Sequence, residues 1–170
     1  MTDIESAATP GCPSLTAPDG EPEWLQADEQ EAWLALIKVI ARLPVDLDRQ
    51  LQSDAALSHF EYLVLAGLSE APDRTLRMSQ LAHFAGGQLP RLSQAAARLE
   101  RRGWLARRSD PSDGRSTLAT LTEQGFAKVV ATAPGHVSQV RDRVFRPLTR
   151  AQVRQLRDIC QRIGAGLSDC

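Results

Sequence analysis

Residues 88–121 decide the fold, and they read QLPRLSQAAARLERRGWLARRSDPSDGRSTLATL. In the first half, Leu92, Ala96 and Leu99 recur at helical spacing and mark one apolar face. The other side chains of this helix are expected to point mostly elsewhere: Gln88, Arg91, Gln94, Ala95, Arg98 and Arg102. Gly103 is the residue type that commonly ends a helix. The first half therefore predicts a helix with one face for a core and another for a polyanion.

The second half of the stretch predicts two short strands. Residues 104–108, WLARR, predict a half-buried strand, whose successive side chains point to opposite faces. Residues 111–115 have the composition of a turn, and residues 116–121 have that of the returning strand. A helix that runs directly into a two-stranded hairpin, with Arg115 near its tip, is the arrangement of a winged helix.

The helices before this stretch complete a helix-turn-helix. Ser58 and Glu61 have the spacing of a capping box, which predicts a helix over 58–69. Ser79 is the predicted N-cap of a short helix over 80–85, and two glycines then precede the helix that starts near Pro90. Two helices joined by a tight glycine turn form the expected DNA-binding motif.

The quoted stretch also resembles the MarR (multiple antibiotic resistance regulator) family of transcription factors. The resemblance rests on four motifs in the family's order: RLS at 91–93, RLERRGWL at 98–105, DPSDGR at 110–115 and LTEQG at 121–125. It extends through helical flanks from about Ala32 to Leu167. It implies a mainly α fold with a small β-wing, in which N- and C-terminal helices join two copies into a homodimer.

The flanks divide the chain into the expected parts. Residues 1–22 are rich in Pro, Gly, Ser, Thr and acids, and they predict a disordered acidic tail. Residues 23–170 read as a single MarR-like domain. Within it, residues 56–121 form the winged-helix DNA-binding lobe, and residues 23–55 and 122–170 form the helical dimerisation region.

Prolines and caps set the expected boundaries of the flanking helices. A long helix is predicted from about Trp24, with a kink or a break at Pro44. After the wing, a helix over 123–132 is expected to be interrupted at Pro134 and Gly135. Thr149 is the predicted cap of the last helix, whose apolar stripe includes Cys160. We expect this cysteine to be buried as a small hydrophobic side chain.

Charge is unevenly distributed along the chain. The formal net charge is only -1. Residues 73–115 nevertheless contain nine arginines and four acids, whereas residues 1–31 contain eight acids and no lysine or arginine. The basic region coincides with the predicted recognition helix and wing, which favours double-stranded DNA as the partner.

Other function classes find little support in the sequence. Three cysteines, an odd number, lack the spacing of a metal site or a disulfide framework, and the three histidines lack a second ligand nearby. No apolar run approaches the ~18 residues of a membrane span. No nucleophile with its base, phosphate loop or metal cluster is present. We therefore expect a cytoplasmic protein that is not an enzyme, needs no metal or other cofactor and does not bind a membrane.

Eight residues are the predicted DNA contacts. The start of the helix is expected to enter the major groove, where Arg91 can bind guanine and Gln88, Ser93 and Gln94 can reach bases or backbone. Arg98 is an expected phosphate contact. Of Arg107 and Arg108, one is expected to contact phosphate and the other to face solvent, and Arg107 is counted as the contact. Arg115 is expected to enter the minor groove, oriented by Asp113, as MarR-like wings imply. The alternative for Asp113 is that its carboxylate caps the backbone of the turn.

The sequence also raises the question of a small-molecule effector. By resemblance, effector pockets lie where the first helix, the second helix and the DNA-binding lobe meet, and four residues could line one: Trp33, Arg42, His59 and Tyr62. Ordinary packing or surface exposure is the alternative for each. The predicted function is a sequence-specific transcriptional regulator, in particular a ligand-responsive repressor that binds a pseudo-palindromic operator as a homodimer. The alternative is a winged-helix protein-interaction module without an operator.

Overall fold

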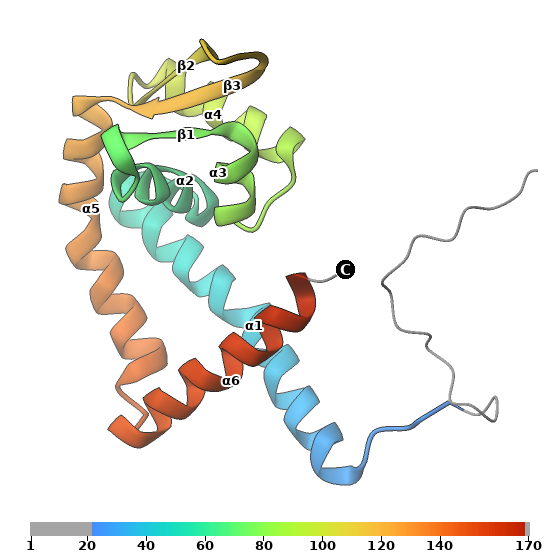
Figure 1. Ribbon diagram of the computed structural model, residues 1–170. Helices are drawn as coiled ribbons and strands as arrows, with labels where there is room; N and C mark the ends of the chain where they lie inside the picture. The colour runs from blue at the N-terminus through green and yellow to red at the C-terminus, as the bar shows by residue number, and fades with distance from the viewer. Residues whose placement is uncertain (1–21, 169–170) are drawn as a thin grey trace, which may run out of the picture. The chain divides into compact units, whose positions relative to one another are not determined.

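The computed structural model describes residues 22–168, and Figure 1 shows the order of its helices and strands. The chain divides into two compact units. One unit is Val39–Arg143, and the other includes the chain up to Lys38 and from Val144 onward. The predicted acidic tail lies outside the described residues except for Pro22.

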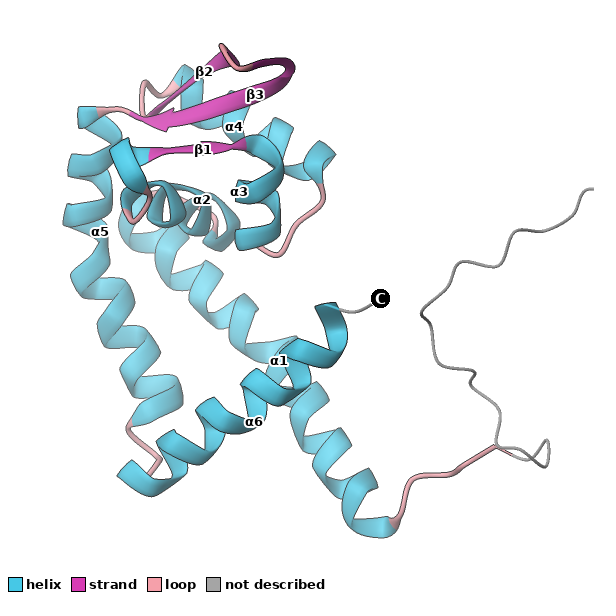
Figure 2. Cartoon of the chain, in the orientation of Figure 1, coloured by secondary structure: helices cyan, strands magenta, loops and turns pink. Residues whose placement is uncertain are grey.

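A three-stranded antiparallel sheet holds the wing, with the strand order β1-β3-β2 (Figure 2). The predicted hairpin consists of β2 (Leu105–Asp110) and β3 (Asp113–Leu121), which only residues 111 and 112 separate. The strands are longer than predicted, so the Asp113 to Arg115 segment belongs to β3 and not to a loop. Strand β1 (Thr75–Arg77) pairs with β3 and was not predicted, because three residues are too few to show an alternating pattern.

Three helices pack with this sheet, and their ends follow the sequence signals closely. Helix α2 (His59–Ser69) has the predicted capping box: Glu61 N–H donates to Ser58 Oγ at 3.2 Å, and Ser58 N–H donates to the Glu61 carboxylate at 3.0 Å. Helix α3 (Met78–Phe84) begins two residues before the predicted start. Gln80 Oε1 accepts a hydrogen bond from the Arg77 N–H at 3.2 Å. This bond caps the start of α3 in place of the predicted Ser79 cap.

The recognition helix candidate is α4 (Leu89–Arg101), with a proline in its first turn. A glycine precedes it and another follows it, Gly86 with φ of 63° and Gly103 with φ of 72°. Both lie in the left-handed region, where a side chain would strain the backbone. The helix is therefore bounded on both sides by turns that favour glycine, as predicted.

Leucines from all these elements form the core of the unit. Several are fully buried, among them Leu65, Leu68, Leu81, Leu92 and Leu99. Ala95 is also fully buried, which corrects the expectation that it points away from the core. Its small side chain lies beside Leu92 and Leu99 on the same helical face, so the buried face of α4 is wider than the sequence pattern indicated.

Two long helices continue through prolines that were expected to interrupt them. Helix α1 (Ala27–Ala55) contains Pro44, and α5 (Glu123–Val140) contains Pro134. The predicted interruption at Pro134 is wrong, and Pro44 does not break α1. A proline has no N–H to donate to the carbonyl group one turn earlier. Both prolines are exposed, so water can donate a hydrogen bond to that carbonyl group.

The second unit contains α6 (Arg150–Ser168), which follows the short η2 helix (Arg141–Phe145). The predicted cap is present, since Gln152 N–H donates to Thr149 Oγ1 at 3.3 Å. Cys160 is exposed, contrary to our expectation, because the apolar stripe of α6 is not covered by its own chain. Nowhere in residues 22–168 does a helix combine the length and apolar character that a membrane span requires.

Candidate DNA-binding interface

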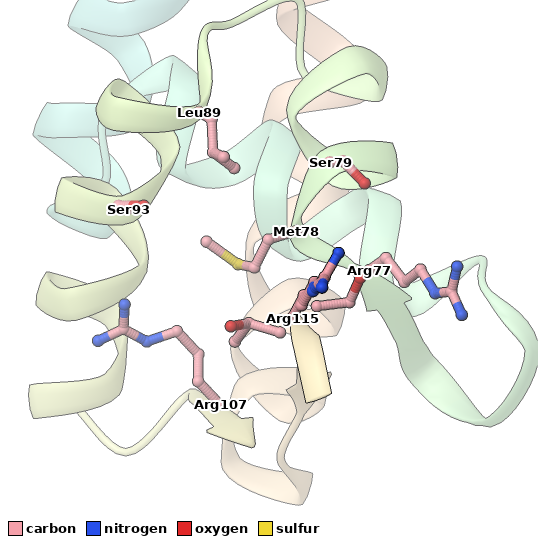
Figure 3. Close-up of a pocket in the computed structure, with 9 residues that line it drawn as sticks. Arg77, Met78, Ser79, Leu89, Ser93, Arg107 and Arg115 are labelled. Carbon is pink, nitrogen blue, oxygen red and sulfur yellow. The ribbon is translucent and has the colours of Figure 1, made fainter. Parts of the chain in front are cut away.

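An open groove lies between α4, the start of α3 and the wing (Figure 3). Its lining combines guanidinium groups and hydroxyl groups with two apolar side chains: Arg77, Met78, Ser79, Leu89, Ser93, Arg107, Arg115, Ser116 and Thr117. No carboxylate is among these lining residues. Cations and hydroxyl donors without an acid are the groups that contact phosphate oxygens in proteins bound to nucleic acid. The groove therefore suits a polyanion.

Arg115 contributes an unpaired guanidinium group to this groove. Its side chain is exposed and forms no ion pair with any residue in 22–168. The Asp113 carboxylate instead accepts the backbone N–H of Arg115 at 3.2 Å and the Ser116 hydroxyl at 2.8 Å. Asp113 thus caps the backbone of the strand start, which is the alternative that the sequence left open, and the Arg115 guanidinium stays available to a ligand.

The wing is attached to the lobe through a carboxylate that the sequence analysis did not single out. Asp110 is buried and accepts the Arg77 Nε at 2.9 Å, the Ser112 N–H at 2.9 Å and the Ser112 hydroxyl at 2.7 Å. The hydrogen bonds from Ser112, followed by that from Arg77, hold the pKa of Asp110 below its usual range. Arg77 and Asp110 lie 33 residues apart, so no local pattern announces the pair. They fix the tip of the wing relative to β1.

Arg98 is bound within the protein. Its Nε donates to Glu61 Oε1 at 2.7 Å, and this glutamate is buried at 6% exposure. Burial raises the pKa of Glu61, but the hydrogen bonds from Arg98 and Ser58 outweigh it, so the pKa lies below its usual range. An Arg98 side chain held in this way joins α4 to α2, and it is half exposed at 47%.

Arg107 is also held by a carboxylate of the same lobe. Glu100 accepts its Nε at 3.1 Å, its Nη2 at 2.7 Å and its backbone N–H at 3.1 Å. The side-chain hydrogen bonds from Arg107 are the main reason that the pKa of Glu100 lies below its usual range. The neighbouring Arg108 is exposed and forms none of the ion pairs found among residues 22–168. Arg108 is therefore the freer of the two cations.

The remaining predicted contacts lie on different sides of α4. Arg91 places its guanidinium carbon 4.2 Å from the centre of the Phe60 ring, which keeps the group beside α2. Gln88 is the exposed N-cap residue, Ser93 lines the groove, and Gln94 is exposed. Arg101 is exposed at the end of the helix and was missed, although its spacing of seven residues from Gln94 places both on one face.

Comparisons with known proteins agree with this geometry. A family model described as the MarR family matches residues 57–116, which include α2, α3, α4 and β2. A crystal structure of Sco3205, a MarR family transcriptional regulator from Streptomyces coelicolor in complex with DNA, is 46% identical. The alignment covers 86% of this chain and 92% of that one, with a TM-score of 0.82. The chain belongs to the MarR family of transcriptional regulators.

Two further relatives match over most of their length. AbsC, a MarR family regulator from Streptomyces coelicolor, is 32% identical with a TM-score of 0.79, over 86% of this chain and 98% of that chain. The HTH-type transcriptional repressor Mb2911 from Mycobacterium bovis is 30% identical over 139 residues, which are 82% of this chain and 97% of that protein. The predicted family, the winged-helix fold and the assignment as a DNA-binding transcriptional regulator are therefore confirmed.

A second polar cluster of this MarR-family chain lies away from the groove. The rings of Tyr62 and His136 have centroids 4.4 Å apart, and those of His59 and His136 are 5.8 Å apart. His136 is buried, and its Nδ1 has no hydrogen-bond partner, nor has the buried Oε1 of Gln50. His136 was not predicted as a member of this cluster, because it lies on α5, far along the chain from His59 and Tyr62. Of the other two predicted pocket residues, Arg42 is exposed and Trp33 is half exposed in the other unit.

Burial dominates the titration of this cluster. It lowers the pKa of His136, and the neighbouring His59 lowers it further. It also lowers the pKa of His59 by more than the charge of Asp48 raises it, and it raises the pKa of Tyr62. The cluster therefore favours neutral rings. Among residues 22–168 no group of histidines, cysteines and acids could hold a metal ion.

Proposed function

We propose that this chain binds a pseudo-palindromic DNA duplex as a homodimer and represses transcription from that site. In this proposal the protein acts in the cytoplasm, and it acts by binding DNA without catalysing a reaction. The observation that carries the proposal is the free guanidinium of Arg115 in the groove beside α4. An α-helix fits the major groove, and an arginine on an adjoining hairpin can reach the negative potential of the neighbouring minor groove. In this arrangement Gln88, Ser93 and Gln94 face the bases, and Arg98 and Arg107 hold α4 and β2 in position. The similarity to Mb2911, which is described as a transcriptional repressor from Mycobacterium bovis, supports repression and not activation.

The dimer is proposed from apolar side chains that the chain leaves uncovered. Ile159, Ile163 and Leu167 on α6 are 54%, 46% and 75% exposed, and Trp33 on α1 is 50% exposed. Exposed apolar surface of this extent marks an interface. We assign residues 23–55 and 122–170 to dimerisation and residues 56–121 to DNA. A two-fold axis then places two copies of α4 about 34 Å apart, one turn of the duplex.

We further propose that a small molecule releases the DNA by binding near His59 and Tyr62. Support comes from the unpartnered Nδ1 of His136 and Oε1 of Gln50, which are polar atoms that a ligand could satisfy. A ligand shifts DNA affinity only when it binds one spacing of the two DNA-binding lobes better than another. Compounds that release a bound duplex from the intact chain but not from a Tyr62→Ala variant would identify this site.

A salt titration of the full chain tests the DNA-binding proposal. The probe is a duplex selected by the protein from a random pool, followed by fluorescence anisotropy between 50 and 200 mM salt. A dimer that neutralises several phosphates should lose at least about tenfold in affinity over this range, because bound counterions are released. A protein-interaction module would select no duplex and show little dependence on salt, which would contradict the proposal.

A further inference from the structure

The two arginines in the first three turns of α4 do not lie on its outermost face. Arg91 stacks on Phe60 at 4.2 Å, and Arg98 is bound to the Glu61 carboxylate at 2.7 Å. Both contacts are with α2 residues, so they hold these guanidinium groups toward the flank of α4 that faces α2. Arginine is the side chain that most often reads guanine. The outermost face of α4 therefore has no arginine in its first three turns.

A different row of residues forms the outermost face of α4. Residues at spacings of four, three and four lie on one side of a helix, here Pro90, Gln94, Ala97 and Arg101. Pro90, Gln94 and Arg101 are exposed, Ala97 is half buried, and the opposite face is buried: Leu92, Ala95, Ala96 and Leu99. In the first three turns this outer row offers hydrogen-bonding groups only through Gln94, between two apolar residues.

The chemistry of this row matches one kind of base pair. Adenine presents an acceptor, N7, beside a donor, N6, and one glutamine amide satisfies both. Thymine presents a methyl group, which prefers an apolar neighbour. Cytosine presents only the N4 donor, which would use the oxygen of the Gln94 amide and leave its N–H donors unpaired. Glu100, the acid of this helix, is occupied by Arg107 at 2.7 Å. Arg101 lies about 10 Å further along the helix axis than Gln94, too far to share its base pair and well placed for phosphate.

We propose that α4 reads an A·T pair in each half-site. The Gln94 amide donates to adenine N7 and accepts from adenine N6, and thymine methyl groups pack against Pro90 and Ala97. This inference rests on the proposed function and specifies which bases the DNA site contains at the position that Gln94 faces. It departs from the sequence prediction, in which Arg91 reads guanine.

Selection from a random duplex pool, followed by atom-level substitution, tests the contact. The full chain should select A·T at symmetrical positions of the two half-sites. Replacing that adenine by 7-deazaadenine, which lacks the N7 acceptor but keeps the N6 donor, should weaken wild-type binding by about 5- to 150-fold, because the Gln94 N–H donor is left unpaired at a cost of about 1–3 kcal/mol. The same replacement should have no effect on Gln94→Ala, because the side chain that senses N7 is gone. Uracil in place of the adjacent thymine should also weaken binding, since it lacks the methyl group.

A change of preference gives the second arm of the experiment. Gln94→Arg should select G·C at the same position, because a guanidinium group donates to both acceptors of guanine. The matched control is Gln124→Arg, which adds the same charge to an exposed position of α5 and should keep A·T. Identical selections by both variants, or equal binding of adenine and 7-deazaadenine by the wild type, would overturn the inference while leaving DNA binding intact. A wild-type chain that selects no duplex would overturn the proposed function and the inference together.

Discussion

Apolar side chains are buried in the lobe from α2 to β3, but several are exposed on the terminal helix α6. In the lobe, Leu65, Leu92 and Leu99 have no exposed surface. On α6, Ile163 is 46% exposed and Leu167 is 75% exposed. One region therefore completes its core within a single chain, and the other has an apolar stripe without a core. The difference indicates that the winged-helix lobe completes its fold within one chain, whereas in the proposed dimer a second copy of the chain covers the apolar stripe of α6.

The largest expected effect is in the lobe. Leu99→Ala should lower the free energy of unfolding by about 2–5 kcal/mol, because it removes a fully buried side chain and leaves a cavity. Urea unfolding at a fixed protein concentration measures this loss. Val130→Ala, at a position 55% exposed, is the control and should change stability by no more than about 0.5 kcal/mol. Equal losses for the two variants would contradict the assignment of Leu99 to a closed core.

The next effect concerns α6. Ile163→Glu should raise the dissociation constant of the dimer by about 30-fold, since a charge placed in an apolar contact costs roughly 2 kcal/mol. Sedimentation equilibrium measures it. Gln161→Glu adds the same charge on the polar side of the same helix and should leave the dimer unchanged. A wild-type chain that sediments as a monomer would show that the exposed stripe has another use.

The smallest expected effect is a dependence of stability on pH. Because burial lowers the pKa of His136, the folded protein binds this proton more weakly than the unfolded chain, whose histidines titrate near pH 6.5. Stability should therefore be complete above that pH and decrease as the pH falls from 7.5 to 5.5. His136→Phe keeps a ring beside Tyr62 but cannot take up a proton, so its urea midpoints should vary less with pH. Equal pH dependence in both proteins would contradict this assignment.

Local signals in the sequence predicted most of the winged-helix lobe. The capping box of Ser58 and Glu61, the proline at the start of α4 and the αL glycine Gly103 each act within a few residues, so they can be recognised in a single sequence. Strand β1 was missed because its three residues form a strand only through their pairing with β3. The interruption expected at Pro134 was wrong, because an exposed helix tolerates the loss of one hydrogen bond.

The candidate site was less predictable, because distant partners decide what each arginine does. Arg98 and Arg107 were predicted as phosphate contacts, and the structure pairs them with Glu61 and Glu100. Glu61 is 37 residues from Arg98 in the chain, so only the packing of α2 on α4 reveals this pair. Their contacts with DNA remain predictions. Arg115 is the predicted contact whose charge no described residue neutralises.

The most direct measurement compares Arg115→Ala with Arg49→Ala in anisotropy titrations on one selected duplex at one salt concentration. Arg49 is an exposed arginine of α1 outside the groove, with a side chain 74% exposed, and its removal should change affinity little. Arg115→Ala should weaken binding by about 1–3 kcal/mol, or 5- to 150-fold, with an unchanged unfolding midpoint and dimer. Equal affinities of the two variants would contradict the central claim that the wing presents a free cation to DNA.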